Sequence, residues 1–237
     1  MNAKIIVLEG GEGVGKTTQT KLLSEALRAK NKNVITYRSP GSTNVGEFLR
    51  KNVCFNSDLG FYSKRLGFLL DYSSIIYDIK NRAENVDEDT YFVIDRFTPI
   101  SGHVYQEYGH GKSPGWSNDI ISEIDRLLKP SLVLYLKPDG YDFVVERSFE
   151  GKPSDELNEN DLKKSSWKRR ILKGYEIVMP SMKDKYNIKE IRFGETESVE
   201  TINNKILIRI EHLVGEGGLL WKFFRLIWIL VAQECSG

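Results

Sequence analysis

The sequence predicts a three-layer α/β fold in which a central parallel sheet is covered by helices on both faces. Two observations support this prediction. Short apolar runs of strand length alternate along the chain with longer segments of helical period, and strands that alternate with helices form parallel sheets. The length of 237 residues is enough for one such domain with a sizeable core.

The individual elements follow from local patterns. Apolar runs bounded by turn residues predict strands at 5–8, 34–37, 91–94, 132–136 and 188–193. Helices are expected after Lys16, over the long amphipathic stretch 59–83, near 167–179 and over 199–213. The first strand passes through a glycine-rich turn directly into its helix, so the chain begins with a strand, a turn and a helix.

The charges of the chain are balanced, with 34 lysines and arginines against 33 aspartates and glutamates. No global field favours a nucleic acid as a partner, and any phosphate recognition must be local. Cys54 and Cys235 lie far apart without metal-type spacing, which fits a reduced protein. The N-terminal residues MNAKIIVLEGG lack the pattern of a signal peptide, so we expect a cytoplasmic protein. From the balanced charge we expect no nucleic-acid partner.

Two segments differ in composition from the rest. We expect residues 1–214 to form the domain, with a mobile lid at about 139–166, where few apolar residues recur at any period. After the glycines at 215–218 the chain turns apolar (LLWKFFRLIWILVA), which sets 215–237 apart as a tail. The apolar part, 219–232, is too short to span a bilayer. We expect it to dock on the protein itself or to make a weak contact with a membrane surface or a partner.

The glycine-rich turn satisfies the phosphate-binding pattern G-x-x-x-x-G-K-[ST] and lies between a predicted strand and a predicted helix, as that pattern requires. In such a P-loop, backbone N–H groups and the helix N-terminus face the phosphates of a nucleotide. Lys16 is expected to reach the β- and γ-phosphates, and Thr17 to hold Mg²⁺. The ATP-binding residues predicted here are Gly10, Gly11, Glu12, Gly13, Val14, Gly15, Lys16, Thr17 and Thr18.

Residues at the ends of two further strands indicate which class of P-loop protein this is. The guanine-recognition string N-K-x-D and the switch string D-x-x-G of GTPases do not occur in the sequence. Instead Arg38 ends the second strand, and Asp95 and Arg96 end the third, at the carboxyl edge of the sheet beside the P-loop. The planar fork of arginine suits a phosphate. We therefore expect a phosphoryl transfer to an acceptor that carries its own phosphate, with Asp95 near the metal or orienting the arginines.

The chain also resembles a known family. GGEGVGKTTQ at 10–19, RSPGST at 38–43, Asp95-Arg96-Phe97 and SGHVYQEYGHG at 101–111 are similar in order and spacing to thymidylate kinases, over about residues 4–213. The resemblance implies a three-layer P-loop NTPase fold, ATP and Mg²⁺ as donor and cofactor, conversion of dTMP to dTDP, and a homodimer.

The resemblance also assigns roles to residues. Lys16, Asp95 and Arg96 correspond to catalytic positions, with Asp95 as the catalytic aspartate and Thr17 and Asp95 at the metal. Arg38 and Arg96 correspond to the arginines that hold the acceptor phosphate. Phe68 falls where the family stacks an aromatic ring on the base, although on residue pattern alone it is equally a core residue of an amphipathic helix. The other predicted substrate contacts are Glu12 at the sugar hydroxyl, Ser101, Tyr105, and Gln106 near the base edge.

The sequence departs from the family in two places. Tyr72 stands four residues after the stacking aromatic, at the position where the family has an arginine that contacts the base. We expect Tyr72 to contact the base through its hydroxyl. The predicted lid has few arginines. Arg147 is the first candidate to reach the γ-phosphate as a catalytic residue, and Arg170 is the second.

Three functions fit these observations. The first is transfer of the γ-phosphate of ATP to dTMP for the synthesis of dTTP, without a covalent enzyme intermediate. The second is a kinase for another deoxynucleoside monophosphate or for a deoxynucleoside. The third, from another class, is an ATP-binding regulatory or membrane-tethered module in which catalysis has decayed.

Overall fold

The structure, a computed structural model, describes residues 3–54, 56, 58–86, 90–112, 115–149 and 159–214, the last range with side chains from 164 onward. The polar segment 150–158 and the apolar tail 215–237 lie outside the described residues. Within the described ranges, no helix combines the length and the hydropathy that a membrane span requires.

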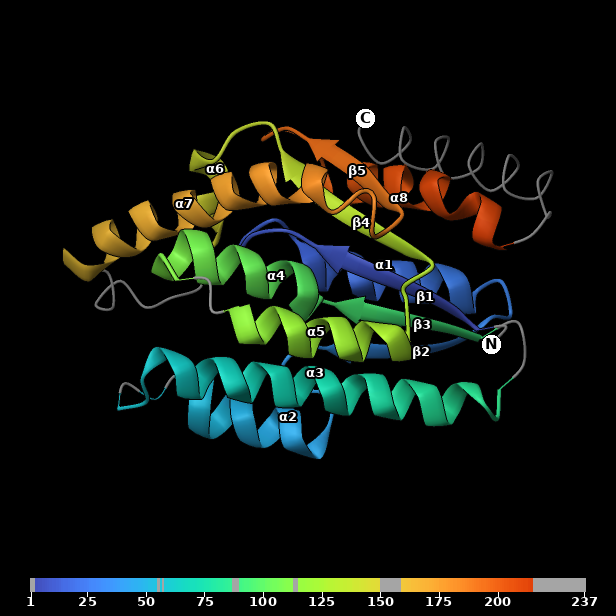
Figure 1. The fold of residues 1–237 in the computed structure, drawn as a ribbon. Coiled ribbons are helices and arrows are strands. Elements are labelled where there is room, and N and C mark those ends of the chain that lie inside the picture. Colours follow the sequence, from blue (N-terminus) through green and yellow to red (C-terminus); the bar gives the residue numbers. More distant parts are fainter. Residues whose placement is uncertain are drawn as a thin grey trace.

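Five parallel strands form one sheet in the order β2-β3-β1-β4-β5 (Figure 1). The strands are β1 (Lys4–Glu9), β2 (Asn33–Arg38), β3 (Thr90–Asp95), β4 (Leu132–Pro138) and β5 (Ile188–Phe193). All five predicted strands are confirmed. In the central strands β1, β3 and β4 nearly every residue is buried. Buried and exposed residues do not alternate along these strands, because helices cover both faces of the sheet.

Eight α-helices and two π-helical turns connect the strands in the described ranges. The helices are α1 (Lys16–Arg28), α2 (Asn44–Leu49), α3 (Phe61–Ala83), α4 (Thr98–Val104), α5 (Gly115–Leu127), α6 (Asp142–Arg147), α7 (Glu159–Ser181) and α8 (Val199–Val214). The π-helical turns are Arg50–Cys54 and Tyr105–Gly109. The predicted helices α1, α3, α7 and α8 are confirmed. The short helices α2, α4 and α6, and the amphipathic α5, were not predicted from the sequence.

The two faces of the sheet carry separate cores. Alternate side chains of one strand point to opposite faces, so Ile5 and Val7 of β1 pack with α3, α4, α5 and α7, whereas Ile6 and Leu8 pack with α1, α6 and α8. Figure 1 shows α3, α4 and α5 on one side of the sheet and α1 and α8 on the other. The predicted three-layer α/β fold is therefore confirmed.

A buried polar network fixes α3 against α5. Asp125 of α5 is 4% exposed, and its Oδ1 accepts a hydrogen bond of 2.8 Å from the hydroxyl of Tyr72 on α3. Its Oδ2 accepts from the hydroxyl of Tyr186 and pairs with Lys185, both of which precede β5. The ring of Tyr72 also packs edge-on against Phe97 at a centroid distance of 5.6 Å. Tyr72 is therefore part of the core between α3 and α5.

Replacing Tyr72 by phenylalanine should lower the free energy of unfolding by about 1–3 kcal/mol, because the buried carboxylate of Asp125 loses a hydrogen-bond donor. Urea unfolding followed by circular dichroism measures the change. Tyr77→Phe is the matched control, because Tyr77 lies on the same helix and is 66% exposed. Equal stabilities of the two variants would contradict a structural role for the Tyr72 hydroxyl.

Candidate active site

The P-loop connects the centre of the sheet to α1. Gly13 and Gly15 have φ angles of 82° and 86°, a region that side chains with a Cβ rarely occupy. A Cβ at position 13 would also lie 2.3 Å from the carbonyl oxygen of Val144. Lys16 is 6% exposed, and its Nζ donates to the carbonyl of Gly10 at 2.8 Å and to that of Gly11. The lysine side chain thus lies folded over the loop that would hold the phosphates of ATP.

A hydroxyl and a carboxylate meet at the start of α1. The Oγ1 of Thr17 donates to the Oδ2 of Asp95 at 2.6 Å, and Asp95 is 4% exposed at the end of β3. Oxygen ligands of this kind suit Mg²⁺, which usually keeps several waters and is held by a few protein oxygens together with phosphate. The described residues contain no cluster of three or more acidic, histidine or cysteine side chains that would hold a metal by themselves. The pair therefore fits a magnesium ion that arrives with ATP.

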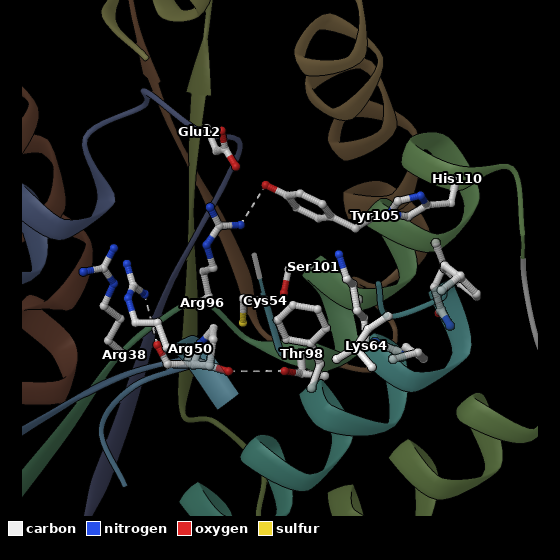
Figure 2. A pocket seen from close by; sticks show the side chains of 18 of the residues that line it. Glu12, Arg38, Arg50, Cys54, Lys64, Arg96, Thr98, Ser101, Tyr105 and His110 are labelled. Atoms are coloured by element: carbon white, nitrogen blue, oxygen red, sulfur yellow. Dashed lines mark hydrogen bonds between the residues drawn. The ribbon is translucent and has the colours of Figure 1, made fainter. Parts of the chain in front are cut away.

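A cavity of about 650 Å³ opens beside the P-loop (Figure 2). Its walls come from the ends of β2 and β3, from α3 and α4, and from the two π-helical turns. The predicted substrate residues that line it are Glu12, Arg38, Phe68, Arg96, Ser101, Tyr105 and Gln106. One cavity thus brings together seven side chains that the sequence placed in five separate segments.

One end of the cavity is strongly basic. Arg38, Arg50 and Arg96 all line it and lie together in Figure 2, whereas Lys64 and His110 lie across the cavity from them. Arg96 Nη1 donates to the hydroxyl of Tyr105 at 2.8 Å. Burial and the neighbouring Arg50 lower the pKa of Arg38, which indicates that these cations repel one another in the free protein. An anion at this end would relieve that repulsion.

Arg50 was missed from the sequence. It follows α2 at the start of a π-helical turn, and its Nη1 donates to the carbonyl of Pro40 at 3.2 Å. No sequence motif marks Arg50. It reaches the cavity because the chain turns back after β2, through α2 and the first π-helical turn.

The opposite walls are less charged. Phe68 is half-buried on the wall, so its position fits a ring that stacks on a ligand rather than a core residue. Ser101 and Gln106 are 8% and 3% exposed, and Gln106 Nε2 donates to the hydroxyl of Ser117 at 2.9 Å. A flat ligand lying on Phe68 would therefore meet polar groups at its edge.

Tyr72 does not reach the cavity. It is 2% exposed, and its hydroxyl is bonded to Asp125 on the side of α3 that faces α5. The expected contact between Tyr72 and a base is thus corrected. The spacing of four residues after Phe68 suggested a shared helix face, but the buried carboxylate of Asp125 holds Tyr72 in the core.

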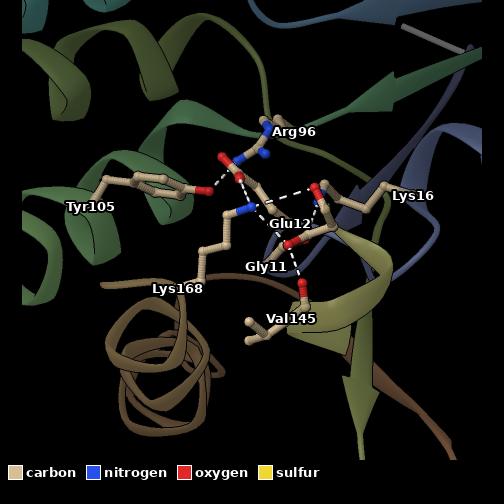
Figure 3. A network of polar contacts seen from close by, with 8 residues as sticks. Gly11, Glu12, Lys16, Arg96, Tyr105, Val145 and Lys168 are labelled. Carbon is tan, nitrogen blue, oxygen red and sulfur yellow. Dashed lines mark hydrogen bonds and ion pairs between the residues drawn. The ribbon is translucent and has the colours of Figure 1, made fainter. Parts of the chain in front are cut away.

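The two arginines predicted for the lid point elsewhere. Arg147 Nη2 donates to the carbonyl of Glu195 at 2.8 Å, and its guanidinium lies over the ring of Phe143. Arg170 is exposed on α7. The basic residue of α7 that faces the P-loop is Lys168, which is 8% exposed and lies 3.6 Å from a carboxylate oxygen of Glu12 (Figure 3). The sequence does not single out Lys168, because it stands in a run of three basic residues with nothing to distinguish it.

Comparisons with known proteins agree with this geometry. The family model for thymidylate kinase matches residues 8–205. The thymidylate kinase of Methylococcus capsulatus is 32% identical over 173 residues, which are 73% of this chain and 79% of that protein. That of Caldanaerobacter subterraneus subsp. tengcongensis is 29% identical over 191 residues, 74% of this chain and 81% of that protein. The crystal structure of thymidylate kinase from Ehrlichia chaffeensis has the same fold, with a TM-score of 0.63, 23% identity, and coverage of 89% of this chain and 98% of that one.

Binding of ATP at about pH 8 should be accompanied by the uptake of up to one proton. Burial, with the positive charge of Arg96, lowers the pKa of Lys16 to about 7, so the free protein holds this lysine largely neutral above that pH. The phosphate oxygens of bound ATP favour the charged form of Lys16 and therefore raise its pKa again. Calorimetry in two buffers of different ionisation enthalpy measures the uptake. Lys16→Met should abolish it, and identical enthalpies in both buffers for the wild type would contradict the prediction.

Proposed function

The chain belongs to the thymidylate kinase family, and from this premise we propose that it transfers the γ-phosphate of ATP to the phosphate of dTMP, giving dTDP. The observation that carries the proposal is the cavity beside the P-loop, whose basic end is formed by Arg38, Arg50 and Arg96. A nucleoside brings no phosphate and would leave these three cations without an anion. The cavity therefore favours a monophosphate acceptor, and no observation on the described residues favours the regulatory alternative.

Positioning and charge neutralisation account for most of the chemistry of such a transfer. The attacking atom is an oxygen of the acceptor phosphate, whose second proton has a pKa of about 6, so it is already deprotonated at neutral pH. No general base is then needed. Arg96 lines the cavity, interacts electrostatically with Lys16 and donates to the hydroxyl of Tyr105. These contacts support a position between the phosphates of donor and acceptor. Arg96 would stabilise the negative charge of the phosphoryl group during in-line transfer.

Thr17 and Asp95 would hold Mg²⁺ in this proposal. When bound, the ion supplies charge neutralisation on the β- and γ-phosphates. Asp95 also accepts a hydrogen bond of 2.6 Å from the hydroxyl of Thr17. This bond fixes the carboxylate relative to the start of α1 before the metal binds. Lys168 of α7 pairs with Glu12 at 3.6 Å and donates to the hydroxyl of Ser148 at 2.7 Å. It would bind the γ-phosphate by exchanging these contacts for the anion.

We also propose that the protein acts in the cytoplasm as a homodimer. The support for a dimer is a stripe of exposed apolar side chains on α3: Tyr62, Leu66 and Leu70 follow one another at intervals of four residues, and each is more than half exposed. Residues four apart lie on one helix face. A continuous apolar face of this kind is more typical of an interface than of a solvated surface.

Arg38→Ala and Arg50→Ala should each raise the KM for dTMP about 10- to 100-fold, because each removes a charge-assisted hydrogen bond to phosphate. The KM for ATP should stay within about threefold, since neither residue belongs to the P-loop. Steady-state kinetics with dTMP and ATP varied in turn measures both constants. Arg209→Ala, an exposed arginine on α8, is the control. An unchanged KM for dTMP in both cavity variants would rule out a monophosphate at this end.

Replacing Leu66 and Leu70 together by aspartate should convert the dimer to a monomer, because the two carboxylates would have to be buried in the interface. Size-exclusion chromatography with light scattering measures the mass. Ile208→Asp is the matched control, since Ile208 is an apolar residue exposed on α8. A monomeric wild type, or a double variant that remains dimeric, would contradict the proposed interface.

A further inference from the structure

A guanidinium that no prediction used lies buried in the wall of the cavity. Arg65 belongs to α3, three residues before Phe68, and an interval of three places both side chains on the same face of the helix. Its exposed fraction is only 3%. Among the charged side chains that line the cavity, arginines at the basic end are exposed or half-buried, whereas Arg65 is almost completely removed from water.

Arg65 has no partner for this buried charge. Its Nε and Nη2 are both buried and make no hydrogen bond among the described residues. Burial alone lowers the pKa of its guanidinium to about 10, with no carboxylate to oppose the shift. Buried charges are normally paired and hydrogen-bonded, because an unpaired one is costly. Because Arg65 and Phe68 line the same cavity, a ligand bound there would supply the missing partner.

The guanidinium lies against the backbone of Gly102. A Cβ at position 102 would lie 2.2 Å from Nη1 and 2.9 Å from Cζ of Arg65, so an added side chain at this point of α4 would displace the guanidinium from its present place. Gly102 directly follows Ser101, and both line the cavity. The guanidinium therefore lies between α3 and α4, on the wall that also carries Ser101.

A guanidinium donates hydrogen bonds and accepts none, so its ligand must present acceptor oxygens or nitrogens. The acceptor phosphate is accounted for by the three arginines at the basic end. The sugar and the base remain. The sugar hydroxyl is expected beside Glu12, whereas the base would lie on Phe68, which is on the same helix face as Arg65. Thymine and uracil carry a carbonyl oxygen at C4, whereas cytosine carries an amino group there, which is a donor and would oppose the donors of Arg65.

We propose that Arg65 donates to the C4 carbonyl oxygen of the acceptor base and thereby selects thymine and uracil over cytosine. Gly102 makes room for this contact, and Tyr72 takes no part in it. The inference rests on the proposed function, because it takes a pyrimidine monophosphate as the ligand of the cavity. It goes beyond that function in naming the residue that determines the base.

The test compares Arg65→Met with the wild type on dTMP, dUMP and dCMP. Methionine keeps an unbranched side chain of similar length and removes the donors. The KM for dTMP and for dUMP should rise about 10- to 100-fold, with little change in kcat or in the KM for ATP, and the preference for dTMP over dCMP should fall by a similar factor. Arg82→Met is the matched control, since Arg82 lies on the same helix and pairs with Asp78 outside the cavity.

A second readout does not depend on activity. Without ligand, Arg65→Met should melt at a higher temperature than the wild type, because it removes an unpaired buried charge, yet dTMP should raise its melting temperature less. Gly102→Ala should weaken dTMP binding in the wild-type background and much less in Arg65→Met, since the added methyl group acts through the guanidinium.

The outcomes separate the two claims. If the wild type phosphorylates dTMP and Arg65→Met keeps both the KM for dTMP and the preference over dCMP within about twofold, the inference is wrong and the proposed function stands. If Tyr72→Phe instead abolishes the preference, the base contact belongs to Tyr72 and the inference is also wrong. If the wild type transfers phosphate to no pyrimidine monophosphate but binds dTMP in a way that requires Arg65, the proposed function fails and the base contact stands.

Discussion

One buried carboxylate connects the three segments that form the site. Glu9 ends β1 with no exposed surface, and it accepts hydrogen bonds from the backbone N–H of Gly10 at 3.0 Å, from the N–H of Phe97, and from the hydroxyl of Tyr175 at 2.8 Å. Gly10 begins the P-loop, Phe97 follows the Asp95-Arg96 pair, and Tyr175 lies on α7. Burial raises the pKa of Glu9, and the backbone N–H and neighbouring cations oppose that shift. The relative positions of the P-loop, the Asp95-Arg96 pair and α7 therefore all depend on one side chain.

The site is built to be completed by its ligands. Lys16 bonds to loop carbonyls, the cavity arginines repel one another, and Arg65 has no partner among the described residues. Each of these arrangements is less favourable than a solvated or paired charge, and each would improve when phosphates and a base arrive. Functional sites commonly hold such unfavourable electrostatics at the expense of stability. In this protein the two hydrophobic cores, one on each face of the sheet, compensate for the stability lost at the site.

The sequence predicted the parts of the site that depend on short-range pattern. The P-loop and Asp95-Arg96 follow strands whose apolar runs are unmistakable, and parallel strands bring their carboxyl ends to one edge of the sheet. Arg38 and Asp95 are in fact register partners on β2 and β3. The domain with its central sheet was predictable for the same reason, since alternating strands and helices leave few topologies.

The missed residues depend on contacts between distant segments. Arg65 sits in a long helix where its neighbours suggest only an amphipathic face, and nothing in the local sequence reveals that Gly102, 37 positions later, leaves a space for it. Tyr72 was assigned to the base by its spacing from Phe68, but Asp125 of another helix holds it in the core. Arg50 and Lys168 likewise reach the site only through tertiary packing. The resemblance to a family supplied positions, and it could not supply the substitutions that this chain has made around them.

The guanidinium of α3, which has no partner among the described residues, also bears on how long the protein resists degradation. A ligand that binds only the native state shifts the folding equilibrium by mass action, and degradation of a protein by proteases follows the population of its open forms when opening is fast. A protein whose buried charge is satisfied by its own acceptor nucleotide would be degraded more slowly when that nucleotide is abundant. Its half-life would then follow the supply of that nucleotide.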